Sequence, residues 1–345
     1  MPVTIKENIS LAPHTIYKIG GPARYFVETK NSDELKQALD FVATKKVPIF
    51  VLGAGSNILV SDKGFDGLVI RMAGGEVKVE GERLTADAGV MMAQAVLKSA
   101  QAALSGFEWA IGVPGTIGGS VRGNAGCFGA EMKDVVESVK ILDLGKSDFP
   151  RKSDFLILKN TQCEFSYRDS IFKKHPEWII LSATLKLQKG DPAKIQEKIK
   201  RITAERAQKQ DIGTKSCGCI FKNISWAPLE VSRPLAAAAV PSGQGGPLTG
   251  WARKDINKEK ILSQFPELEQ FKDQPNVPAS FLIDRAGLKG KSVGHVFISP
   301  KHANYFVNEG GATAEGVVTL IGIAKDTVRH KYELSLEEEI QYVGF

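Results

Sequence analysis

Residues 112–131 read GVPGTIGGSVRGNAGCFGAE, and seven of these twenty residues are glycine. A shorter glycine run comes earlier in the chain, as Gly53-Ala54-Gly55-Ser56-Asn57. Glycine adopts positive φ angles and has no Cβ to hold another group away from the backbone. Successive backbone N–H groups in such turns form a concave nest that suits a pyrophosphate. The two stretches together predict paired loops that hold a dinucleotide, and the alternative is that the glycines only make tight turns.

Neither loop has a standard nucleotide-binding fingerprint. No Gly-Lys-Ser or Gly-Lys-Thr occurs in either loop, which argues against a P-loop. The apolar residues Ile58-Leu59-Val60 follow the first loop and are typical of a strand, whereas a Rossmann motif needs a helix there. Paired loops from a mixed α/β domain are therefore the better interpretation.

The length and composition are those of a globular protein with two or three domains. The chain has 345 residues, of which 43% are hydrophobic and 24% charged. A net charge of +6 fits an anionic substrate as well as it fits nucleic acid. Since no basic motif interleaved with aromatic residues is present, we expect no nucleic-acid partner.

Targeting and metal signals are weak. The N-terminus has no apolar core of a signal peptide, and no stretch is apolar for long enough to span a bilayer, so we expect a cytoplasmic protein with no membrane partner. The four cysteines are then expected to be reduced thiols. Cys217-x-Cys219 has no second cysteine pair to complete a zinc site, so we expect no metal.

The periodicity and capping signals predict alternating strands and helices. Strands are expected at residues 24–29, 49–52, 135–143, 179–187 and 336–343. Helices are expected from a cap at Asn31 or Ser32, and at about residues 91–104, 192–209, 258–263, 278–286 and 313–332. Residues 224–276 differ in composition and are interpreted as an insertion with loop character.

Three further motifs accompany the two glycine loops, and a fourth lies near the C-terminus. They are TIYKIGGPA at residues 15–23, FSYRDS at 165–170, SCGCIFKN at 216–223 and LEEEI at 336–340. In this order and spacing the chain resembles the UDP-N-acetylenolpyruvoylglucosamine reductase family, over nearly its whole length except residues 224–276. The resemblance is to the short-looped form of the family, which lacks a tyrosine-bearing flap.

The resemblance implies an α+β fold, with an FAD-binding domain of the vanillyl-alcohol-oxidase type and a smaller α/β substrate-binding domain. The expected boundaries are 1–210 for the FAD-binding domain (lobes at about 1–71 and 72–210), 211–332 for the substrate domain with an insertion at about 224–276, and 333–345 for a strand that returns to the active site. The insertion is expected to be a lid or an added surface of the substrate domain. A monomer is expected.

The resemblance also implies the reaction. NADPH, as co-substrate, reduces FAD, and the reduced flavin converts the UDP-sugar substrate UDP-N-acetylglucosamine enolpyruvate to UDP-N-acetylmuramate, a step of peptidoglycan synthesis and cell-wall biogenesis. The first glycine loop contains no histidine or cysteine to attach a flavin, so non-covalent FAD is expected.

The family's catalytic positions correspond to Arg168, Cys219 and Glu339. Arg168 is expected to stabilise the charge that develops on the substrate carboxylate, for which its planar guanidinium is suited. The family has serine where this chain has Cys219, and a thiol gives up a proton more readily than a hydroxyl. Cys217 is the alternative thiol, and Glu337 is the alternative to Glu339 because the two share one face of a strand.

The motif positions also give binding residues. The expected cofactor-binding residues are Gly53, Gly55, Ser56, Asn57, Gly115, Thr116, Gly118, Gly119, Asn124, Gly126 and Arg206, where a solvated helix face is the alternative for Arg206. The expected substrate-binding residues are Tyr167, Lys222, Asn223, Lys301, His302 and Asn304, which could donate to phosphates and a uridine.

Two other functions remain open at this point. An oxidase of the same superfamily would keep the flavin domain, but it would not need an acid that protonates carbon. A flavin- or nucleotide-binding module could instead use Cys217 and Cys219 for redox sensing. Consumption of NADPH that depends on an enolpyruvyl acceptor separates the reductase from both.

Overall fold

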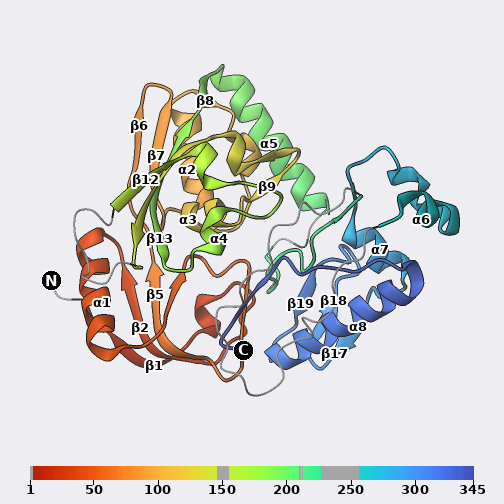
Figure 1. Cartoon of the computed structure of the whole chain (residues 1–345). Helices are drawn as coiled ribbons and strands as arrows, with labels where there is room; N and C mark the ends of the chain where they lie inside the picture. The colour runs from red at the N-terminus through yellow and green to blue at the C-terminus, as the bar shows by residue number, and fades with distance from the viewer. Residues whose placement is uncertain (1–2, 146–154, 210, 212, 227–255) are drawn as a thin grey trace. The chain divides into compact units, whose positions relative to one another are not determined.

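The chain divides into two compact units that are interleaved in sequence. The computed structural model describes residues 3–145, 155–209, 211, 213–226 and 256–345 (Figure 1). Unit 1 comprises residues 1–10, 22–56 and 65–209, and unit 2 comprises residues 11–21, 57–64 and 210–345. Most of the expected insertion, residues 227–255, lies outside the described residues.

The first lobe of unit 1 is a four-stranded sheet covered by one helix. The strand order is β1 (Lys6–Ser10), β2 (Pro22–Thr29), β5 (Phe65–Met72) and β3 (Ile49–Leu52). Strands β2, β5 and β3 are parallel, and β1 is antiparallel to β2. Helix α1 (Ser32–Lys45) begins where the Asn31 side chain accepts a hydrogen bond from the Glu34 N–H, and it buries Leu35, Ala38 and Leu39.

The second lobe of unit 1 is an antiparallel five-stranded sheet. Its order is β12 (Phe155–Lys159), β11 (Val136–Asp143), β13 (Trp178–Lys186), β7 (Arg83–Asp87) and β6 (Val77–Glu80). The helices are α2 (Met92–Gln101), α3 (Ile117–Arg122), α4 (Ile171–Lys174) and α5 (Pro192–Lys209). Two short ladders complete the lobe, β8 (Leu104–Ser105) with β14 (Gln188–Lys189) and β9 (Gly126–Cys127) with β10 (Ala130–Glu131).

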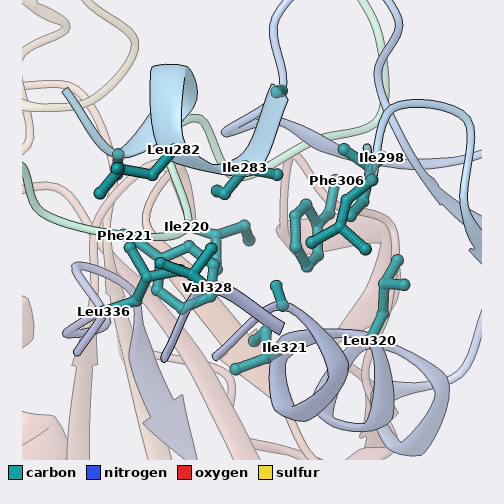
Figure 2. Close-up of a cluster of buried hydrophobic side chains, with 14 of the residues drawn as sticks. Ile220, Phe221, Leu282, Ile283, Ile298, Phe306, Leu320, Ile321, Val328 and Leu336 are labelled. Carbon is teal, nitrogen blue, oxygen red and sulfur yellow. The ribbon is translucent and has the colours of Figure 1, made fainter. Parts of the chain in front are cut away.

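Unit 2 packs helices against a small antiparallel sheet. The sheet has β17 (Ser292–Val293), β18 (Val296–Ile298) and β19 (Phe306–Asn308), and β15 (Ile224–Ser225) pairs separately with β16 (Asn276–Val277). The helices are α6 (Lys258–Gln264), α7 (Ala279–Arg285) and α8 (Ala314–Tyr332). Figure 2 shows Phe306, Leu320 and Phe221 in the apolar core that these elements enclose.

Two segments from the N-terminal part of the chain belong to unit 2. Strand β4 (Ile58–Val60) pairs in parallel with β20 (Gln341–Val343). The Asp62 carboxylate accepts hydrogen bonds from the Ala314 and Glu315 N–H groups at the start of α8. Tyr17 is completely buried in the same core. Residues 11–21 and 57–64 therefore group with unit 2, whereas the expected boundaries placed them in the first domain.

The strongly periodic helices are confirmed, and three local expectations change. The expected strand at residues 336–343 is shorter, because β20 begins only at Gln341. The second glycine stretch contains a helix, α3, that was not predicted. Arg206 is 7% exposed, so the interpretation of its position as a solvated helix face is wrong. Within the described ranges, no helix has the length and hydropathy needed to cross a bilayer.

Candidate functional site

The two glycine loops pack directly against each other in unit 1. A Cβ on Gly53 would lie 2.6 Å from the Thr116 Oγ1, a distance that real Cβ atoms do not show. A Cβ on Gly115 would lie 3.2 Å from the Ser56 Oγ, and Gly115 has a φ of +139°. Glycine is therefore required at both positions if the loops are to approach this closely. The prediction that a strand rather than a helix follows the first loop is confirmed by β4.

The second loop leads into a short capped helix. The Thr116 side chain accepts a hydrogen bond from the Gly119 N–H at 3.4 Å and caps α3. Gly118 is buried, and its N–H donates to the Ala88 carbonyl oxygen at 2.9 Å. A Cβ on Gly118 would lie 2.8 Å from the Ala88 Cβ, so this glycine serves helix packing. Gly119 is exposed on the same helix.

Asn124 and Arg168 join the second glycine loop to the turn of residues 166–169. Asn124 is fully buried, and its Nδ2 donates to the Ser166 carbonyl oxygen at 2.8 Å and to the Glu131 carboxylate at 3.0 Å. Its Oδ1 accepts from the Lys133 N–H at 2.9 Å. The Asn124 side chain thus bonds to backbone groups of Ser166 and Lys133. This is a structural role, in addition to the predicted contact with the cofactor.

The turn presents Arg168 in an unusual backbone conformation. Ser166 and Asp169 exchange two backbone hydrogen bonds, of 3.0 and 3.1 Å. Arg168 has a φ of +56°, a left-handed conformation that a non-glycine residue adopts at a cost. Its Nη2 donates to the Gly126 carbonyl oxygen at 2.8 Å, and its guanidinium lies over the Tyr167 ring at 5.4 Å. The candidate catalytic arginine is therefore fixed to the second glycine loop.

Arg206 reaches the same loop from α5. Its Nη1 donates to the Cys127 Sγ at 3.4 Å, and that thiol lies 3.0 Å from the Trp109 carbonyl oxygen. A Cβ on Gly112 would lie 3.1 Å from the Arg206 Nε. Burial raises the pKa of Cys127, and Arg206 and Arg168 oppose that rise. No motif pointed to Cys127, because a single cysteine in a glycine loop has no recognisable partner.

The two cysteines of the SCGCIFKN motif have different environments. Cys217 is 3% exposed, and burial raises its pKa far above the usual value, with the neighbouring Cys219 and Glu339 adding to the rise. Gly218 has a φ of +82°, so the chain turns between the two thiols. Cys219 is half-buried. None of the four cysteines, all within the described ranges, forms a disulfide.

The LEEEI segment lies beside the thiol segment in unit 2. The Glu339 N–H donates to the Ile220 carbonyl oxygen at 2.8 Å, and the Lys222 N–H donates to the Glu337 carbonyl oxygen at 2.9 Å. The Asn57 Nδ2 donates to the Glu339 carbonyl oxygen at 3.1 Å. Two predicted catalytic residues, Cys219 and Glu339, are thus on adjacent backbone segments. Asn57, a predicted pyrophosphate residue, is bonded to the second of these segments.

The predicted substrate-binding residues have varied surroundings. Lys222 forms an ion pair with Glu337 at 2.5 Å, and the Asn223 Oδ1 accepts from the Ala279 N–H at the start of α7. Tyr167 is 37% exposed and Lys301 is exposed. Asn304 is 2% exposed, and its amide bonds to the backbone of Phe221, which leaves little of it for a substrate.

His302 lies on a loop that Ser299 organises. The Ser299 Oγ accepts from the N–H groups of Lys301 and His302 and donates to the Asp211 carboxylate. Burial lowers the pKa of His302, so the ring is neutral near pH 7. Its Nδ1 is buried with no hydrogen-bond partner among the described residues. The roles of Ser299 and Asp211 were missed at the sequence level. The available signal was a serine before Pro-Lys-His, since a serine hydroxyl can bond to the backbone of the residues that follow it in a turn.

Unit 1 therefore collects the two glycine loops, Arg168 and Arg206, and unit 2 collects Cys219, Glu339 and the loop of residues 299–305. The glycine loops fit an FAD pyrophosphate: they pack closely at Gly53 and Gly115, where neither loop has a Cβ, and they contain the hydroxyls of Ser56 and Thr116. The residues that would hold the cofactor in unit 1 are those of loops 53–56 and 115–126, together with Arg206.

Comparison with known proteins gives consistent matches over the whole chain. A family model described as FAD binding domain matches residues 23–147, and one described as UDP-N-acetylenolpyruvoylglucosamine reductase, C-terminal domain, matches residues 208–343. A reductase of that name from Lactobacillus helveticus is 34% identical over 343 residues, covering 99% of this chain and 96% of the relative. One from Caldanaerobacter subterraneus is 34% identical over 338 residues, covering 98% and 93%.

A solved structure supports the same relationship. The crystal structure of UDP-N-acetylenolpyruvylglucosamine reductase (MurB) from Thermus caldophilus is similar over 99% of both chains, with a TM-score of 0.70 and 28% sequence identity. The similarity at this coverage and the two matched domains confirm the predicted α+β class, with an FAD-binding domain followed by a second domain.

Proposed function

The chain belongs to the UDP-N-acetylenolpyruvoylglucosamine reductase family, and on that premise we propose that it reduces UDP-N-acetylglucosamine enolpyruvate to UDP-N-acetylmuramate with NADPH as the electron donor. It is an FAD-dependent oxidoreductase of peptidoglycan precursor synthesis. Action in the cytoplasm as a monomer is part of the proposal and rests on the sequence interpretation alone.

The observation that carries the proposal is the pairing of the thiol segment with the glutamate segment in unit 2. The Glu339 N–H bonds to the carbonyl of Ile220, the residue directly after Cys219. Reduction of an enolpyruvyl double bond adds two electrons and a proton to one carbon and a second proton to its neighbour. A half-buried thiol beside a carboxylate segment supplies a proton donor for that second step.

Non-covalent FAD, once reduced by NADPH, supplies the hydride for the first addition. Arg168, held by the Gly126 carbonyl and by the aromatic ring of Tyr167, is positioned by its own contacts and offers a fixed positive charge. We assign it the stabilisation of the enolate-like charge on the substrate carboxylate, because preorganised charge is the strongest form of such stabilisation. Cys219 is assigned the proton donation, and Glu339 the orientation of the reacting groups.

The experiment separates the two half-reactions. In Cys219→Ala, NADPH should bleach the flavin at the wild-type rate, whereas reoxidation by UDP-N-acetylglucosamine enolpyruvate should slow by about 10²–10⁴-fold, the range for a lost general acid. Cys219→Ser should retain substantial reoxidation, because a hydroxyl can replace the thiol as the donor. Stopped-flow absorbance of the flavin measures both steps.

The matched control is Cys217→Ala, which removes the other thiol of the same motif. Cys217 is buried and its raised pKa keeps it protonated, so this variant should lose stability and keep both half-reactions. Normal reoxidation in Cys219→Ala would show that the donor assignment is wrong. A purified protein that consumes no NADPH when the enolpyruvyl substrate is added would refute the proposed function itself.

A further inference from the structure

Three backbone segments lie side by side in unit 2 and together hold Cys219. The central segment is residues 219–222. On one side it pairs with residues 337–339, through a bridge between Phe221 and Glu338. On the other side it pairs with residues 304–305, through a bridge between Cys219 and Tyr305 and a 2.9 Å hydrogen bond from the Ile220 N–H to the Asn304 carbonyl oxygen.

The backbone N–H and C=O of Phe221 make no hydrogen bond to residues 337–339. They can therefore be satisfied only from the opposite side of the segment. Two hydrogen bonds join the central segment to residues 337–339: the Lys222 N–H donates one, and the Ile220 carbonyl oxygen accepts the other. Lys222 and Ile220 are the residues on either side of Phe221. Phe221 and Glu338 therefore form a non-hydrogen-bonded antiparallel pair, in which the N–H and C=O of Phe221 point away from Glu338. Phe221 is 1% exposed, so water does not reach these groups readily.

Asn304 satisfies both groups with one side chain. Its Oδ1 accepts from the Phe221 N–H at 2.9 Å, and its Nδ2 donates to the Phe221 carbonyl oxygen at 2.8 Å. The amide thus acts as the missing residue of a strand ladder. Asn304 is also part of the loop of residues 299–305, which carries Lys301 and His302.

We propose that Asn304 is a positioning residue that fixes the Cys219 thiol relative to the Glu339 segment and to the substrate loop of residues 299–305. This inference rests on the proposed function for its catalytic consequence. Asn304 itself is buried and does not have to touch the substrate.

Apolar packing and the preceding glycine constrain this segment less than its hydrogen bonds do. Figure 2 shows the side chains of Ile220 and Phe221 in the apolar core, near Leu336 and Val328. Apolar packing retains a segment but is non-directional. On the other side of Cys219, Gly218 has positive φ and a conformational freedom that other residues lack. The directional constraint on the residues that follow Cys219 therefore comes from hydrogen bonds, and Asn304 supplies two of them from one side chain, opposite the bonds to residues 337–339.

Asn308 provides a matched control in the same unit. It is 4% exposed, its Nδ2 donates to the Tyr17 carbonyl oxygen at 2.9 Å, and its Oδ1 accepts from the Gly310 and Ala312 N–H groups. In both Asn304→Asp and Asn308→Asp, the acceptor oxygen stays and one donor to a backbone carbonyl is lost. The two variants thus differ in the carbonyl group that loses its donor, which is that of Phe221 in Asn304→Asp and that of Tyr17 in Asn308→Asp.

We expect Asn304→Asp to slow flavin reoxidation by the enolpyruvyl substrate by about tenfold to a hundredfold, the cost of a small misplacement of a reacting group. Flavin reduction by NADPH should stay near the wild-type rate. The pH dependence of Cys219 alkylation by iodoacetamide, followed by peptide mass spectrometry, should shift. Asn308→Asp should lower the melting temperature comparably and change neither the reoxidation rate nor the Cys219 alkylation profile.

The proposal is overturned if the two Asp variants slow reoxidation equally at equal loss of melting temperature, or if alkylation of Cys219 is the same in both. Asn304→Ser and Asn308→Ser repeat the comparison with smaller neutral side chains, for the case that a buried carboxylate unfolds the protein. Absence of turnover in the unmodified protein would refute the proposed function, whereas the alkylation comparison would still decide the positioning role.

Discussion

Three consecutive glutamates, Glu337, Glu338 and Glu339, show how one residue step changes chemistry. Glu337 is exposed and forms an ion pair with Lys222, and Glu338 forms one with Lys325 at 3.0 Å. Glu339 is half-buried, and both its N–H and its carbonyl are bonded within unit 2, to Ile220 and Asn57. The alternation of a strand could not separate Glu337 from Glu339, but their surroundings favour Glu339 as the functional carboxylate.

The pair Glu339→Gln and Glu337→Gln tests this choice. Glu339→Gln keeps the shape and the backbone bonds and removes the charge, so reoxidation of the flavin by the enolpyruvyl substrate should slow by about tenfold or more. Glu337→Gln removes a solvent-screened ion pair, and such pairs contribute little. Its two half-reactions should match the wild type in stopped-flow traces. The reverse ranking of the variants would assign the role to Glu337.

At the scale of elements, α5 is anchored to unit 1 by a buried carboxylate. Glu108 is 2% exposed, and its carboxylate accepts from the Ser105 hydroxyl at 2.6 Å, from the Lys198 ammonium of α5 at 3.0 Å and from the Gly106 N–H. Burial favours the neutral acid, but the hydrogen bonds from Ser105 and Lys198 outweigh it and lower the pKa of Glu108. The contact fixes the helix that carries Arg206.

Substitution Glu108→Gln should therefore destabilise the protein in a pH-dependent way. At neutral pH we expect a loss of about 1–3 kcal/mol, the usual cost of disrupting a buried hydrogen-bonded group. Because the folded pKa is depressed, the stabilisation by Glu108 is complete above the pKa of an unfolded glutamate, about 4.3, and disappears as the pH falls through the folded value. Urea midpoints of variant and wild type should converge in acid.

The partly exposed carboxylate of Glu137 gives the control for this experiment. It lies on β11 of the five-stranded sheet and pairs at 2.7 Å with Arg83 of β7, where solvent screens the interaction. Glu137→Gln should leave the urea midpoint nearly unchanged at every pH. A Glu108→Gln deficit that stays constant down to strong acid would mean that packing, and not the charge, accounts for it.

Elements with local signals were predictable from the sequence. The Asn31 cap and the apolar face of α1 depend only on neighbouring residues. Helix α3 was missed because glycine lowers helix propensity, whereas the Thr116 cap and the burial of Ile117 and Val121 in the core stabilise it. The burial of Arg206 was not predictable, because it depends on Gly112 and Cys127 from a distant loop.

At the scale of the whole molecule, bound FAD should contribute to stability. Ligand that binds only the folded state stabilises by about 2.7 kcal/mol at a hundredfold excess over the Kd. Removal of the flavin at high salt should lower the melting temperature, and added FAD should restore it. FMN, which lacks the pyrophosphate-linked adenosine, should restore less if the glycine loops bind a pyrophosphate.

Hydrogen exchange locates the effect of FAD. Protection on FAD binding should concentrate in residues 53–56 and 112–126, the two loops that pack through Gly53 and Gly115. Protection that is uniform over unit 1, or a melting temperature that FAD does not change, would contradict the assignment of these loops to the cofactor.

The interleaving of the two units was not predictable from the motifs. The expected boundaries assigned residues 1–210 to the FAD-binding domain, because motifs give the order of functional residues along the chain and carry no information on which segments pack together. Residues 57–64 belong to unit 2 through long-range contacts: β4 pairs with β20, and Asp62 caps α8. No local pattern in β4 or Asp62 predicts its distant partner, β20 or the start of α8.

That interleaving sets an order of assembly during translation. Asn57 and its partner Glu339 are 282 residues apart, so β4 leaves the ribosome long before β20 exists. Residues 65–209 form one uninterrupted run of unit 1 and can condense while β4 still exposes Ile58, Leu59 and Val60. Until Gln341–Val343 are synthesised, those apolar residues can bind chaperones or pair with the wrong strand. Deletion of β20 should therefore cause aggregation of a protein whose glycine loops are intact.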